Sequence, residues 1–479
     1  MQFIFGFGII LLEKIFKILR GTPLKHLFSE KLLRFAQTLD RPLYAVGGFT
    51  RDFLTGLQGK HSDIDLCGAI PAKELTQKAE DFGFLIRAVY ANTGTVKLQE
   101  DSDEDYEYTC FRSDKYIRGR HTPSEIFFTD DITLDAKRRD FTVNAIYYNL
   151  KTGEFVDPLG GIPAVREKRL TTVCEAKKVF GEDGLRLMRL ARQCAQLGFT
   201  PDDDCLAGAT QHSALILDIA AERIFAELSL LLNADEKYGV EGGHYQGLLC
   251  LEKTGVLSKI LPELTLGKGM VQRSDYHRYD VLNHSLRAVY YAQKEVRLAA
   301  LLHDVGKPYC QLRDGKMYGH PEEGARIAEE ILHRLKAPKK TVSEVKELVK
   351  WHMYDFDLGV KENKLRRFFV DHLPILDKLL LVKQADFSAC RDDTSVAPTV
   401  KKWKALLDKM KAEHAPMQIK DLALRGDELP PLGVPTKSIA EVLKELLYFA
   451  VCEPTLNAKE KLIKLVPAAL KTVKDRQHS

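Results

Sequence analysis

Two aspartates separated by one residue offer the clearest potential for chemistry in this chain. Asp63 and Asp65 lie in the segment Ser-Asp-Ile-Asp-Leu at 62–66. In a β-strand, residues i and i+2 point to the same face, so the two carboxylates would lie side by side. A bound Mg²⁺ relieves their mutual repulsion, because this ion prefers carboxylate oxygens and substrate phosphates. An isolated pair of this kind is more often just the polar side of an exposed strand. The neighbouring motifs must therefore distinguish a metal site from a solvated strand face.

The segment Gly-Gly-Phe-Thr-Arg-Asp at 47–52 lies just upstream of this pair. Glycines let the backbone approach a phosphate, and the N-terminus of the following helix offers free N–H donors. Gly48 is therefore a candidate phosphate contact. Arg51 is another, because its guanidinium is a fork-shaped donor that fits phosphate oxygens. A phosphate-binding turn followed by paired carboxylates predicts metal-dependent phosphoryl transfer.

Two-metal phosphoryl transfer usually needs a third carboxylate on a neighbouring strand. Glu107 is the best candidate, because it lies inside the strand-like segment Tyr106–Phe111. The acidic residues just before it resemble a solvated turn.

The elements that must position these residues form an α+β head. Apolar and alternating segments predict strands, a helix follows the glycine pair, and Phe141–Asn149 is ambiguous between helix and strand. From about Lys177 the pattern becomes helical, with one helix predicted over Phe180–Leu197 and Gly198 as its C-cap. The strands are expected at Leu43–Val46, Ile64–Leu66, Thr95–Leu98 and Tyr106–Phe111, and the helix after the glycines at Phe49–Leu57.

The composition is that of a globular chain with several domains. Of the 479 residues, 45% are hydrophobic and 29% are charged, and domain sizes predict about three or four units. The net charge is only +4, so nucleic-acid binding would have to come from local basic patches. Nine cysteines are scattered without a C-x-x-C pair, which favours a reducing cytoplasm and argues against a disulfide framework or a zinc knuckle.

Four motifs in order resemble a known family. They are the glycine turn at 47–52, Asp-x-Asp at 63–65, Arg-Arg-Asp-Phe-Thr-Val-Asn-Ala at 138–145 and Glu-Asp-Gly-Leu-Arg at 182–186. Together they resemble the bacterial-type (class II) tRNA nucleotidyltransferase and poly(A) polymerase family of the polymerase β superfamily. The resemblance implies a nucleotidyltransferase head with a small mixed sheet, Mg²⁺ as cofactor, and addition of nucleotides to RNA 3′ ends.

Asp183 and Arg186 are expected to select the base. At spacing i and i+3 they would share one helix face, where an intrahelical ion pair worth about 0.3–0.5 kcal/mol is the simpler explanation. An Asp acceptor and Arg donors also match the amino group and adjacent ring acceptor that cytosine and adenine share. The resemblance implies the base-selecting role for this pair. It further implies that Asp140 and Asn144 help to position the ribose and the primer end. Arg139 could contact phosphate. Arg189 and Arg192 extend the basic stripe of the helix, where they could contact the triphosphate or the RNA backbone or simply be solvated.

A second group of residues predicts a metal centre in the helical part. His284, the adjacent His303-Asp304 pair and Asp386 follow the order H…HD…D, and the segment at 299–307 resembles the HD phosphohydrolase superfamily. Imidazole and carboxylate ligands suit Mn, Ni, Co or Fe. His320 and His352 are candidate further ligands.

The favoured hypothesis is an enzyme that adds C, C and A to the tRNA 3′ end from CTP and ATP without a template. A polar loop at 113–120 resembles the family's flexible loop and argues against a chain that adds only C. A poly(A) polymerase or an A-adding enzyme would share every motif. A phosphohydrolase whose head only binds RNA, and a non-catalytic RNA-binding protein, are alternatives of other classes. No DNA or membrane partner is expected.

Five segments are predicted along the chain. The apolar N-terminus at 1–12 is shorter than the roughly 20 residues that span a bilayer, so a docked helix or an over-extended start is expected there. The lysine-rich segment Lys401–Lys411 could bind tRNA phosphates or simply be solvated. The predicted boundaries are an N-terminal extension at 1–25, the head at 26–168, a neck and body at 169–268, an HD domain at 269–395 and a helical tail at 396–479.

Overall fold

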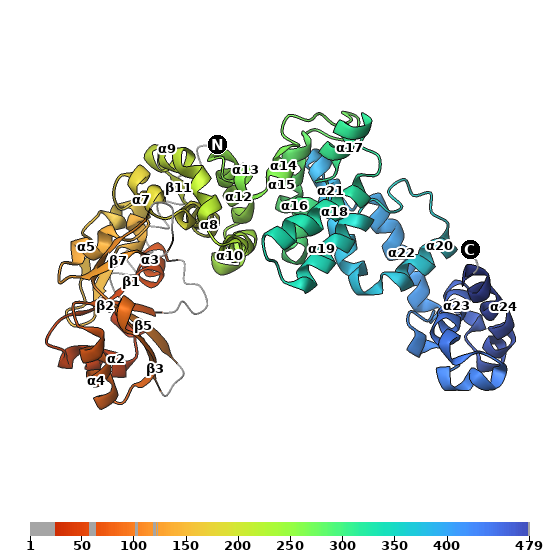
Figure 1. The fold of residues 1–479 in the computed structure, drawn as a ribbon, viewed down its shortest axis with the longest axis horizontal. Coiled ribbons are helices and arrows are strands. Elements are labelled where there is room, and N and C mark those ends of the chain that lie inside the picture. The colour runs from red at the N-terminus through yellow and green to blue at the C-terminus, as the bar shows by residue number, and fades with distance from the viewer. Residues whose placement is uncertain (1–23, 57–63, 101–103, 118–120, 122, 478–479) are drawn as a thin grey trace. The chain divides into compact units, whose positions relative to one another are not determined.

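The chain forms two compact units, Met1–Thr265 and Leu266–Ser479 (Figure 1). The computed structural model describes residues 24–56, 64–100, 104–117, 121 and 123–477. Asp63 and the apolar N-terminal segment lie outside these residues, so the expectations for them stay predictions. The predicted α+β head followed by a helical remainder is confirmed.

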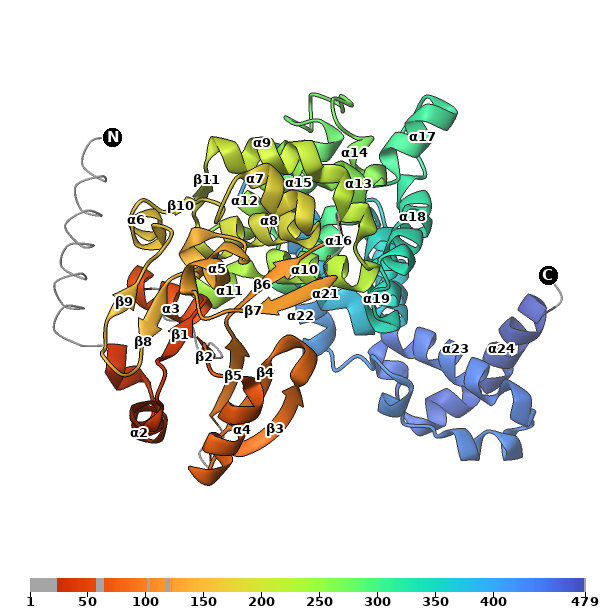
Figure 2. The same ribbon diagram turned by 60° about the vertical axis from the view of Figure 1, so that its left-hand side comes forward.

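A seven-stranded mixed sheet forms the centre of the first unit. Its strand order is β3-β4-β5-β2-β1-β8-β9, in which β2 and β5 are parallel and the other neighbouring strands are antiparallel. Figure 2 shows β3, β4 and β5 side by side, with the hairpin β6–β7 separate from the sheet. The strands are β1 Leu43–Val46, β2 Ile64–Gly68, β3 Leu85–Tyr90, β4 Thr95–Gln99, β5 Asp105–Cys110, β6 Arg112–Lys115, β7 Glu125–Phe128, β8 Tyr147–Asn149 and β9 Phe155–Val156.

Alternating side chains explain why β5 can carry a functional residue. Tyr106, Tyr108 and Cys110 are buried, while Glu107 and Thr109 between them are only partly buried. Since successive side chains of a strand point to opposite faces, the tyrosines anchor the strand in the core and Glu107 lies on the opposite face.

Helix α3 (Gly48–Thr55) begins at a glycine turn that no other residue would fit easily. Gly47 has φ = +84°, a conformation that residues with a side chain rarely adopt. A Cβ atom at this position would also lie 3.1 Å from Oδ2 of Asp65. The glycine therefore brings the start of α3 directly against the Asp65 carboxylate.

Helices complete the first unit. Those of the head are α2 Glu30–Thr38, α4 Ala72–Asp81, α5 Ile132–Lys137 and α6 Gly161–Arg166, with short 3-10 turns at Leu24–Leu27, Ala91–Thr93 and Thr142–Asn144. After the two-residue strands β10 (Arg169–Leu170) and β11 (Thr200–Pro201), the helices are α7 Ala176–Glu182, α8 Leu185–Leu197, α9 Asp203–His212, α10 Ala221–Leu232, α11 Ala234–Tyr238, α12 Gly243–Lys253, α13 Leu257–Ile260 and α14 Pro262–Thr265, with a 3-10 turn at Ser213–Asp218.

The prediction of one continuous helix over Phe180–Leu197 is wrong. The chain leaves the helix at Asp183, which has extended backbone angles, and α8 starts at Leu185. Gly184 packs so closely against the backbone that a Cβ there would lie 2.4 Å from the carbonyl oxygen of Leu215. This tertiary contact fixes the break, and Gly198 ends α8 in the left-handed conformation as predicted.

The described part of the second unit contains helices and no strand. Its α-helices are α15 Val281–Tyr291, α16 Arg297–Leu302, α17 Lys307–Asp314, α18 His320–Arg334, α19 Lys339–Trp351, α20 Glu362–Asp371, α21 Leu376–Arg391, α22 Pro398–Ala412, α23 Ile439–Cys452 and α24 Lys459–Gln477. In the tail, α23 and α24 share an apolar core (Figure 1). Short 3-10 turns lie at Lys294–Val296, Leu373–Ile375, Ile419–Asp421, Gly426–Glu428, Pro430–Leu432, Thr436–Ser438 and Pro454–Leu456.

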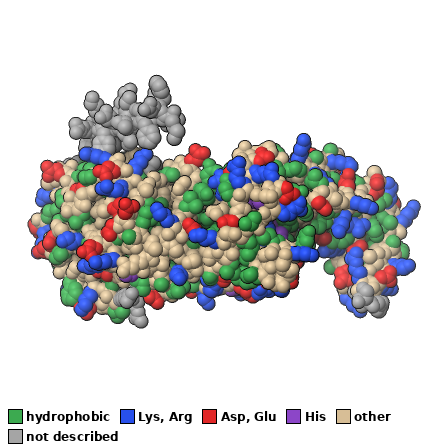
Figure 3. Space-filling view, turned by 90° about the horizontal axis from the view of Figure 1, so that it is seen from above, with side chains coloured by type: hydrophobic (Ala, Val, Ile, Leu, Met, Phe, Trp, Pro, Cys, Tyr) green, Lys and Arg blue, Asp and Glu red, His purple; other side chains and the backbone are tan. Residues whose placement is uncertain are grey.

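None of the helices in the described ranges combines the length and the hydropathy needed to cross a membrane. Basic and acidic side chains are interspersed over the face drawn in Figure 3, in line with the small net charge of +4.

Candidate functional site

Asp65 and Glu107 face each other across the parallel strands β2 and β5. The register of the two strands pairs these residues directly, so both carboxylates lie on the same face of the sheet. Asp65 is exposed, and Glu107 is partly exposed and forms an ion pair with Nζ of Lys97 at 3.2 Å. The structure thus brings together two of the three predicted metal ligands.

A cavity of about 350 Å³ adjoins Asp65. Six arginines and one lysine line it against three aspartates, which makes it suited to a polyanion such as a triphosphate. Every residue that the sequence nominated for nucleotide binding lines this cavity: Gly48, Arg51, Arg139, Asp140, Asn144, Asp183, Arg186, Arg189 and Arg192.

The Arg51 guanidinium is bound within the protein. Its Nη1 donates to Asn144 Oδ1 at 2.6 Å and to Gln193 Oε1 at 3.2 Å, and its Nη2 donates to Asp52 at 2.6 Å and to the Tyr238 hydroxyl at 3.1 Å. Only 4% of Arg51 is exposed. Arg51 therefore holds α3, α8 and α11 together, and a direct phosphate contact would compete with these bonds.

Asp140, which is buried, and Arg189, which is partly exposed, form an ion pair at one wall of the cavity. Arg189 Nε donates to Asp140 Oδ2 at 2.7 Å, while Asn144 Nδ2 and the Phe141 amide donate to Oδ1. Burial acts to raise the pKa of Asp140, but Arg189 and these hydrogen bonds outweigh it and hold the pKa well below its usual range. Asp140 is therefore a carboxylate at neutral pH.

Asp183 and Arg186 are close together, although not on one continuous helix. Asp183 Oδ1 accepts from the Leu185 amide at 2.9 Å and so caps α8, and Oδ2 lies 2.8 Å from His121 Nδ1. Arg186 Nε lies 3.9 Å from Asp183 Oδ2. The expectation that both residues share a helical face is wrong, because Asp183 precedes the first turn of α8.

Backbone carbonyls fix the Arg186 side chain. Its Nη2 donates to Arg138 O at 2.7 Å and its Nη1 to Val179 O at 3.0 Å, and its guanidinium lies over the Tyr116 ring at 5.4 Å. Such anchoring lowers the entropy that the side chain would lose on binding a base.

The other two predicted arginines also have partners within the protein. Arg139 contacts Asp135 and the Tyr147 hydroxyl, at 3.2 and 3.3 Å. Arg192 donates to Glu227 at 2.5 Å and to Gln196 at 2.9 Å.

Four histidines and two aspartates form the centre predicted in the second unit. They come from α15, α16–α17, α18, α19 and α21, which pack against one another (Figure 1). Two ligand groups are present, His284–His303–Asp386 and Asp304–His320–His352. Asp304 connects them: its Oδ2 lies 3.4 and 3.2 Å from His284 and His303, and its Oδ1 lies 3.3 and 3.6 Å from His320 and His352.

Contacts with backbone carbonyl oxygens orient three of the four imidazoles. Nδ1 of His303, His320 and His352 lies 2.7, 2.8 and 2.6 Å from a backbone carbonyl oxygen, which leaves Nε2 to face Asp304. This is the arrangement that metal-binding histidines adopt in proteins. Lys307 Nζ forms an ion pair with Asp304 Oδ2 at 2.6 Å. The angles do not suit a hydrogen bond, and neither carboxylate oxygen of Asp304 has a hydrogen-bond partner within the described structure.

The buried charges of this centre fit a cation. Burial acts to raise the pKa of Asp304, but His303 and Lys307 hold it well below its usual range. Burial acts to lower the pKa of His303, but Asp304 and Asp386 raise it to about 10. His303 and Asp304 are 0% and 1% exposed. A divalent metal ion would take the place of the proton on His303 and neutralise the buried carboxylates, since metal ligation requires neutral imidazole and ionised carboxylate.

Comparison with known proteins places the chain in a family. The family described as "Poly A polymerase head domain" matches residues 43–171, "Probable RNA and SrmB-binding site of polymerase A" matches 198–266, and "HD domain" matches 281–387. An A-adding tRNA nucleotidyltransferase of Deinococcus radiodurans is 32% identical over 371 residues, which cover 73% of this chain and 77% of that protein. The chain belongs to the tRNA nucleotidyltransferase and poly(A) polymerase family. The resemblance of its motifs is thereby confirmed.

Another relative is similar in sequence, and two solved structures share the fold. The Multifunctional CCA protein of Burkholderia mallei is 30% identical over 317 residues, or 62% of this chain and 71% of that protein. The CCA-adding enzyme of Bacillus stearothermophilus in complex with CTP has a TM-score of 0.63 at 22% identity, with 93% of this chain and 98% of that chain covered. The Thermotoga maritima CCA-adding enzyme in complex with tRNA has a TM-score of 0.59 at 18% identity, covering 92% and 94%. As a member of the tRNA nucleotidyltransferase and poly(A) polymerase family, the protein is an enzyme that transfers nucleotides.

The structure adds cavity residues that sequence reasoning missed. Gln193 and Gln196 follow Arg186 and Arg189 along the same face of α8, so the spacing 186, 189, 193, 196 was a usable signal. Four further lining residues are Tyr116, His121, Arg138 and Lys237. In the second unit, Lys307 was also missed as a site residue. Its signal in the sequence was its place at the end of the His-Asp-Val-Gly-Lys segment.

The Asp140–Arg189 pair predicts a specific pH dependence of stability. Because the folded-state pKa of Asp140 is lowered, its stabilising effect is present above the unfolded-state value of about 3.9 and is lost as pH falls below it. We expect Asp140→Asn to be less stable than the wild type at pH 7 by about 1–2 kcal/mol, since solvent screens the partly exposed Arg189.

Thermal unfolding at pH 5 and at pH 3 tests this expectation. The melting temperature of Asp140→Asn should fall less between the two values than that of the wild type. Asp130→Asn, which removes an exposed carboxylate paired with Arg41 at 3.2 Å, is the control and should keep the wild-type slope. An unchanged slope in Asp140→Asn would show that Asp140 titrates normally.

Proposed function

We propose that this enzyme adds C, C and A to the 3′ end of tRNA, using CTP and ATP without a nucleic-acid template. The observation that carries the proposal is the convergence of all nine predicted nucleotide-binding residues on one arginine-rich cavity beside Asp65. Relatives described as A-adding and as CCA proteins, and solved structures in complex with CTP and with tRNA, support it.

In this proposal Asp63, Asp65 and Glu107 supply oxygen ligands for two Mg²⁺ ions. The ions would activate the primer 3′-hydroxyl and stabilise the leaving pyrophosphate. Glu107 must exchange its contact with Lys97 for this role, which is feasible because both side chains are about half exposed, at 45% and 49%. Gly47 and Gly48 let the triphosphate approach the start of α3, next to the carboxylates.

Asp183 and Arg186 would recognise the base. The Asp183 oxygen that faces His121 is the acceptor available for an exocyclic amino group, so the base would replace His121 as its partner. Arg186 is held in place by two carbonyls and can donate to the adjacent ring acceptor. Guanine and uracil do not present a donor and an acceptor in this order, which would explain selection of C and A without a template.

Arg51, Asp140 and Asn144 are assigned as positioning residues. They form one hydrogen-bonded chain, since Asn144 accepts from Arg51 and donates to Asp140. Arg139, Arg189 and Arg192 add positive charge to the same walls and would attract the triphosphate or the RNA backbone.

An A-adding enzyme is the alternative within the family, because the relative with 32% identity carries that description. Incubation of a tRNA that ends at the discriminator base with labelled CTP alone separates the two. A CCA-adding enzyme incorporates the label, whereas an enzyme restricted to A leaves it in solution.

A second activity is favoured by the histidine–aspartate centre. We propose that His284, His303, Asp304, His320, His352 and Asp386 hold transition-metal ions such as Mn, Ni, Co or Fe for phosphatase or 2′,3′-cyclic phosphodiesterase chemistry. The bridging position of Asp304 between two ligand groups supports a pair of ions. Such ions would generate a hydroxide nucleophile and polarise the phosphoryl oxygens.

Replacement of Asp304 by Asn tests this second activity. We expect hydrolysis of a 2′,3′-cyclic phosphate with added Ni²⁺ or Mn²⁺ to fall by at least about 100-fold, because loss of a ligand or of its supporting contact typically costs 10–100-fold and Asp304 serves both groups. Asp377→Asn, an exposed position on α21, is the matched control. Hydrolysis that survives in Asp304→Asn, or that disappears in Asp65→Asn, would contradict the assignment.

We also propose that the protein acts in the reducing cytoplasm. All nine cysteines are free, and six of them are buried, so their packing does not depend on disulfide formation.

A further inference from the structure

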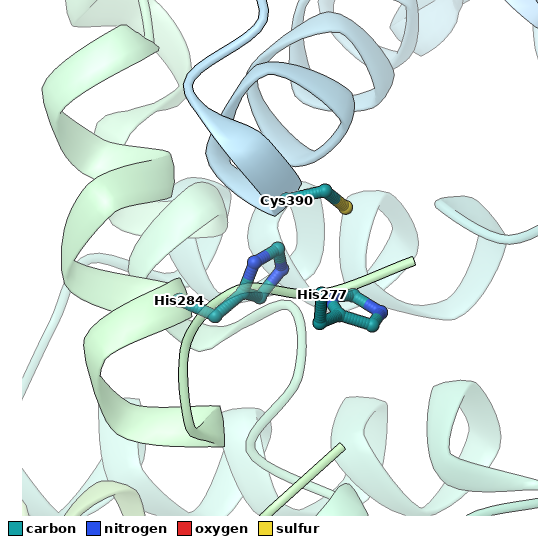
Figure 4. Close-up of side chains that lie close together, drawn as sticks. All are labelled: His277, His284 and Cys390. Carbon is teal, nitrogen blue, oxygen red and sulfur yellow. The ribbon is translucent and has the colours of Figure 1, made fainter. Parts of the chain in front are cut away.

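A third group of metal-binding side chains adjoins the histidine–aspartate centre. His277, His284 and Cys390 each offer one ligand atom, and these atoms lie within 4.8 Å of one another. Figure 4 shows that they come from separate segments: His277 precedes α15, His284 lies on α15 and Cys390 lies near the end of α21. Neither His277 nor Cys390 is needed for the two ligand groups that Asp304 connects.

The imidazole of His284 differs from the other three of the centre. It is fully buried, and its Nδ1 has no hydrogen-bond partner within the described structure. His303, His320 and His352 instead have Nδ1 next to a carbonyl oxygen. A buried polar atom without a partner is destabilising, so such an atom in a native protein needs an explanation.

His277 shows the same feature. Its ring lies 4.8 Å from that of His284 at 89°, and its Nδ1 also lacks a partner among the described residues. The two imidazoles are therefore adjacent, yet neither Nδ1 is hydrogen-bonded to the other ring. A cation bound between them and a third ligand would engage both rings.

Cys390 supplies that third ligand. Its Sγ donates to the backbone carbonyl of Asp386 at 3.4 Å, a weak hydrogen bond that a metal–sulfur bond can replace. A thiolate with two imidazoles is a set that suits Zn²⁺ and other soft divalent ions and does not suit Mg²⁺. The two groups around Asp304 each hold two imidazoles and one carboxylate and no sulfur ligand, so the two kinds of site would differ in metal preference.

We propose that His277, His284 and Cys390 form a separate site for one soft divalent cation, of which Zn²⁺ is the best match. On binding through Nδ1 of His284, the cation replaces the proton of the Cys390 thiol, which is released to solvent, while the ring proton of His284 stays on Nε2, which lies 3.0 Å from Asp386 Oδ1. When Nε2 holds an ion of the neighbouring centre, that ring proton is released to solvent as well. A solvent molecule would complete the four ligands that Zn²⁺ prefers. This site goes beyond the proposed function and does not depend on hydrolysis by the neighbouring centre.

Cobalt serves as the probe, because a thiolate bound to Co²⁺ gives a sulfur-to-metal charge-transfer band in the near ultraviolet. Full-length protein, freed of metal by a chelator, should develop this band on titration with Co²⁺ and lose it when Zn²⁺ is added. Cys390→Ser should lack the band and bind one equivalent of metal fewer. Cys452→Ser, which removes another partly buried thiol that donates to a carbonyl, should keep both.

Two further variants keep the test decisive. His277→Gln should weaken Co²⁺ binding at this site and reduce the band, which guards against misfolding of Cys390→Ser as an explanation. Asp304→Asn removes the residue that connects the other two groups and should keep the band. Absence of the band in the wild type, or its loss in Asp304→Asn, would overturn the proposal, the latter by showing that Cys390 binds an ion of the centre itself.

Discussion

Replacement of Asp65 by Asn lowers nucleotide addition to tRNA by at least about 10³-fold, because the loss of several kcal/mol of charge stabilisation at a catalytic metal has that size. The Asp65 side chain is exposed at the start of β2 and is paired in register with Glu107, so the substitution removes the proposed ligand without disturbing the core. Initial rates with saturating CTP and ATP measure the effect. It should appear in kcat, since the interaction strengthens in the transition state.

The control for Asp65→Asn is Asp130→Asn, which also replaces an exposed carboxylate of the head. It should retain the wild-type rate, and both variants should retain the wild-type melting temperature. Asp63→Asn is expected to match Asp65→Asn. Near-normal addition in the Asp65→Asn and Asp63→Asn double variant would remove the basis for the assigned metal site.

Replacement of Asp183 by Asn relaxes the choice of base. The substitution keeps an acceptor for the Leu185 amide, so the cap of α8 survives. It can replace the acceptor next to His121 by an N–H donor, which matches the carbonyl oxygens of uracil and guanine. Since a hydrogen bond to a charged group is worth about 1.5–3 kcal/mol, we expect the preference for CTP over UTP to fall by about 10- to 100-fold.

Competition between CTP and UTP, and between ATP and GTP, measures this change as a ratio of kcat/KM values. Glu182→Gln removes the other carboxylate near Arg186, at 3.3 Å, and should leave the ratio unchanged. An unaltered ratio in Asp183→Asn, with normal folding, would show that another group reads the base.

Short sequence motifs were enough to predict those helices and strands of the head whose positions are set by residues close in sequence. The glycine pair at 47–48 and the alternation around Glu107 are short-range signals, and the structure places α3 and β5 there. The strand at Leu85–Tyr90 was missed, because its sequence Leu-Ile-Arg-Ala-Val-Tyr does not alternate between apolar and polar residues, although exposed and partly buried side chains alternate along most of the strand in the structure.

Long-range contacts account for what the sequence could not show. The break at Asp183 depends on the backbone of Leu215, which approaches Gly184 too closely for a side chain. The bonds that fix Arg51 come from Asn144, Gln193 and Tyr238, 93 to 187 residues away. No spacing rule relates such positions, so the internal role of Arg51 became visible only with the fold.

The histidine–aspartate centre also combines a local motif with long-range contacts. The adjacent His303-Asp304 pair is a local motif, and its partners were found because they are histidines and an aspartate in a known order. His277 and Cys390 follow no such order, and only the packing of α15 against α21 brings them to His284.

Sequencing of the tRNA 3′ ends made by the purified enzyme tests the central claim most directly. The substrate is a tRNA that ends at the discriminator base, incubated with CTP and ATP together. We predict a single extension, C-C-A, that stops after the terminal A. Ends that carry only A, whether one residue or a long ladder, would contradict CCA addition and identify an A-adding enzyme or a poly(A) polymerase.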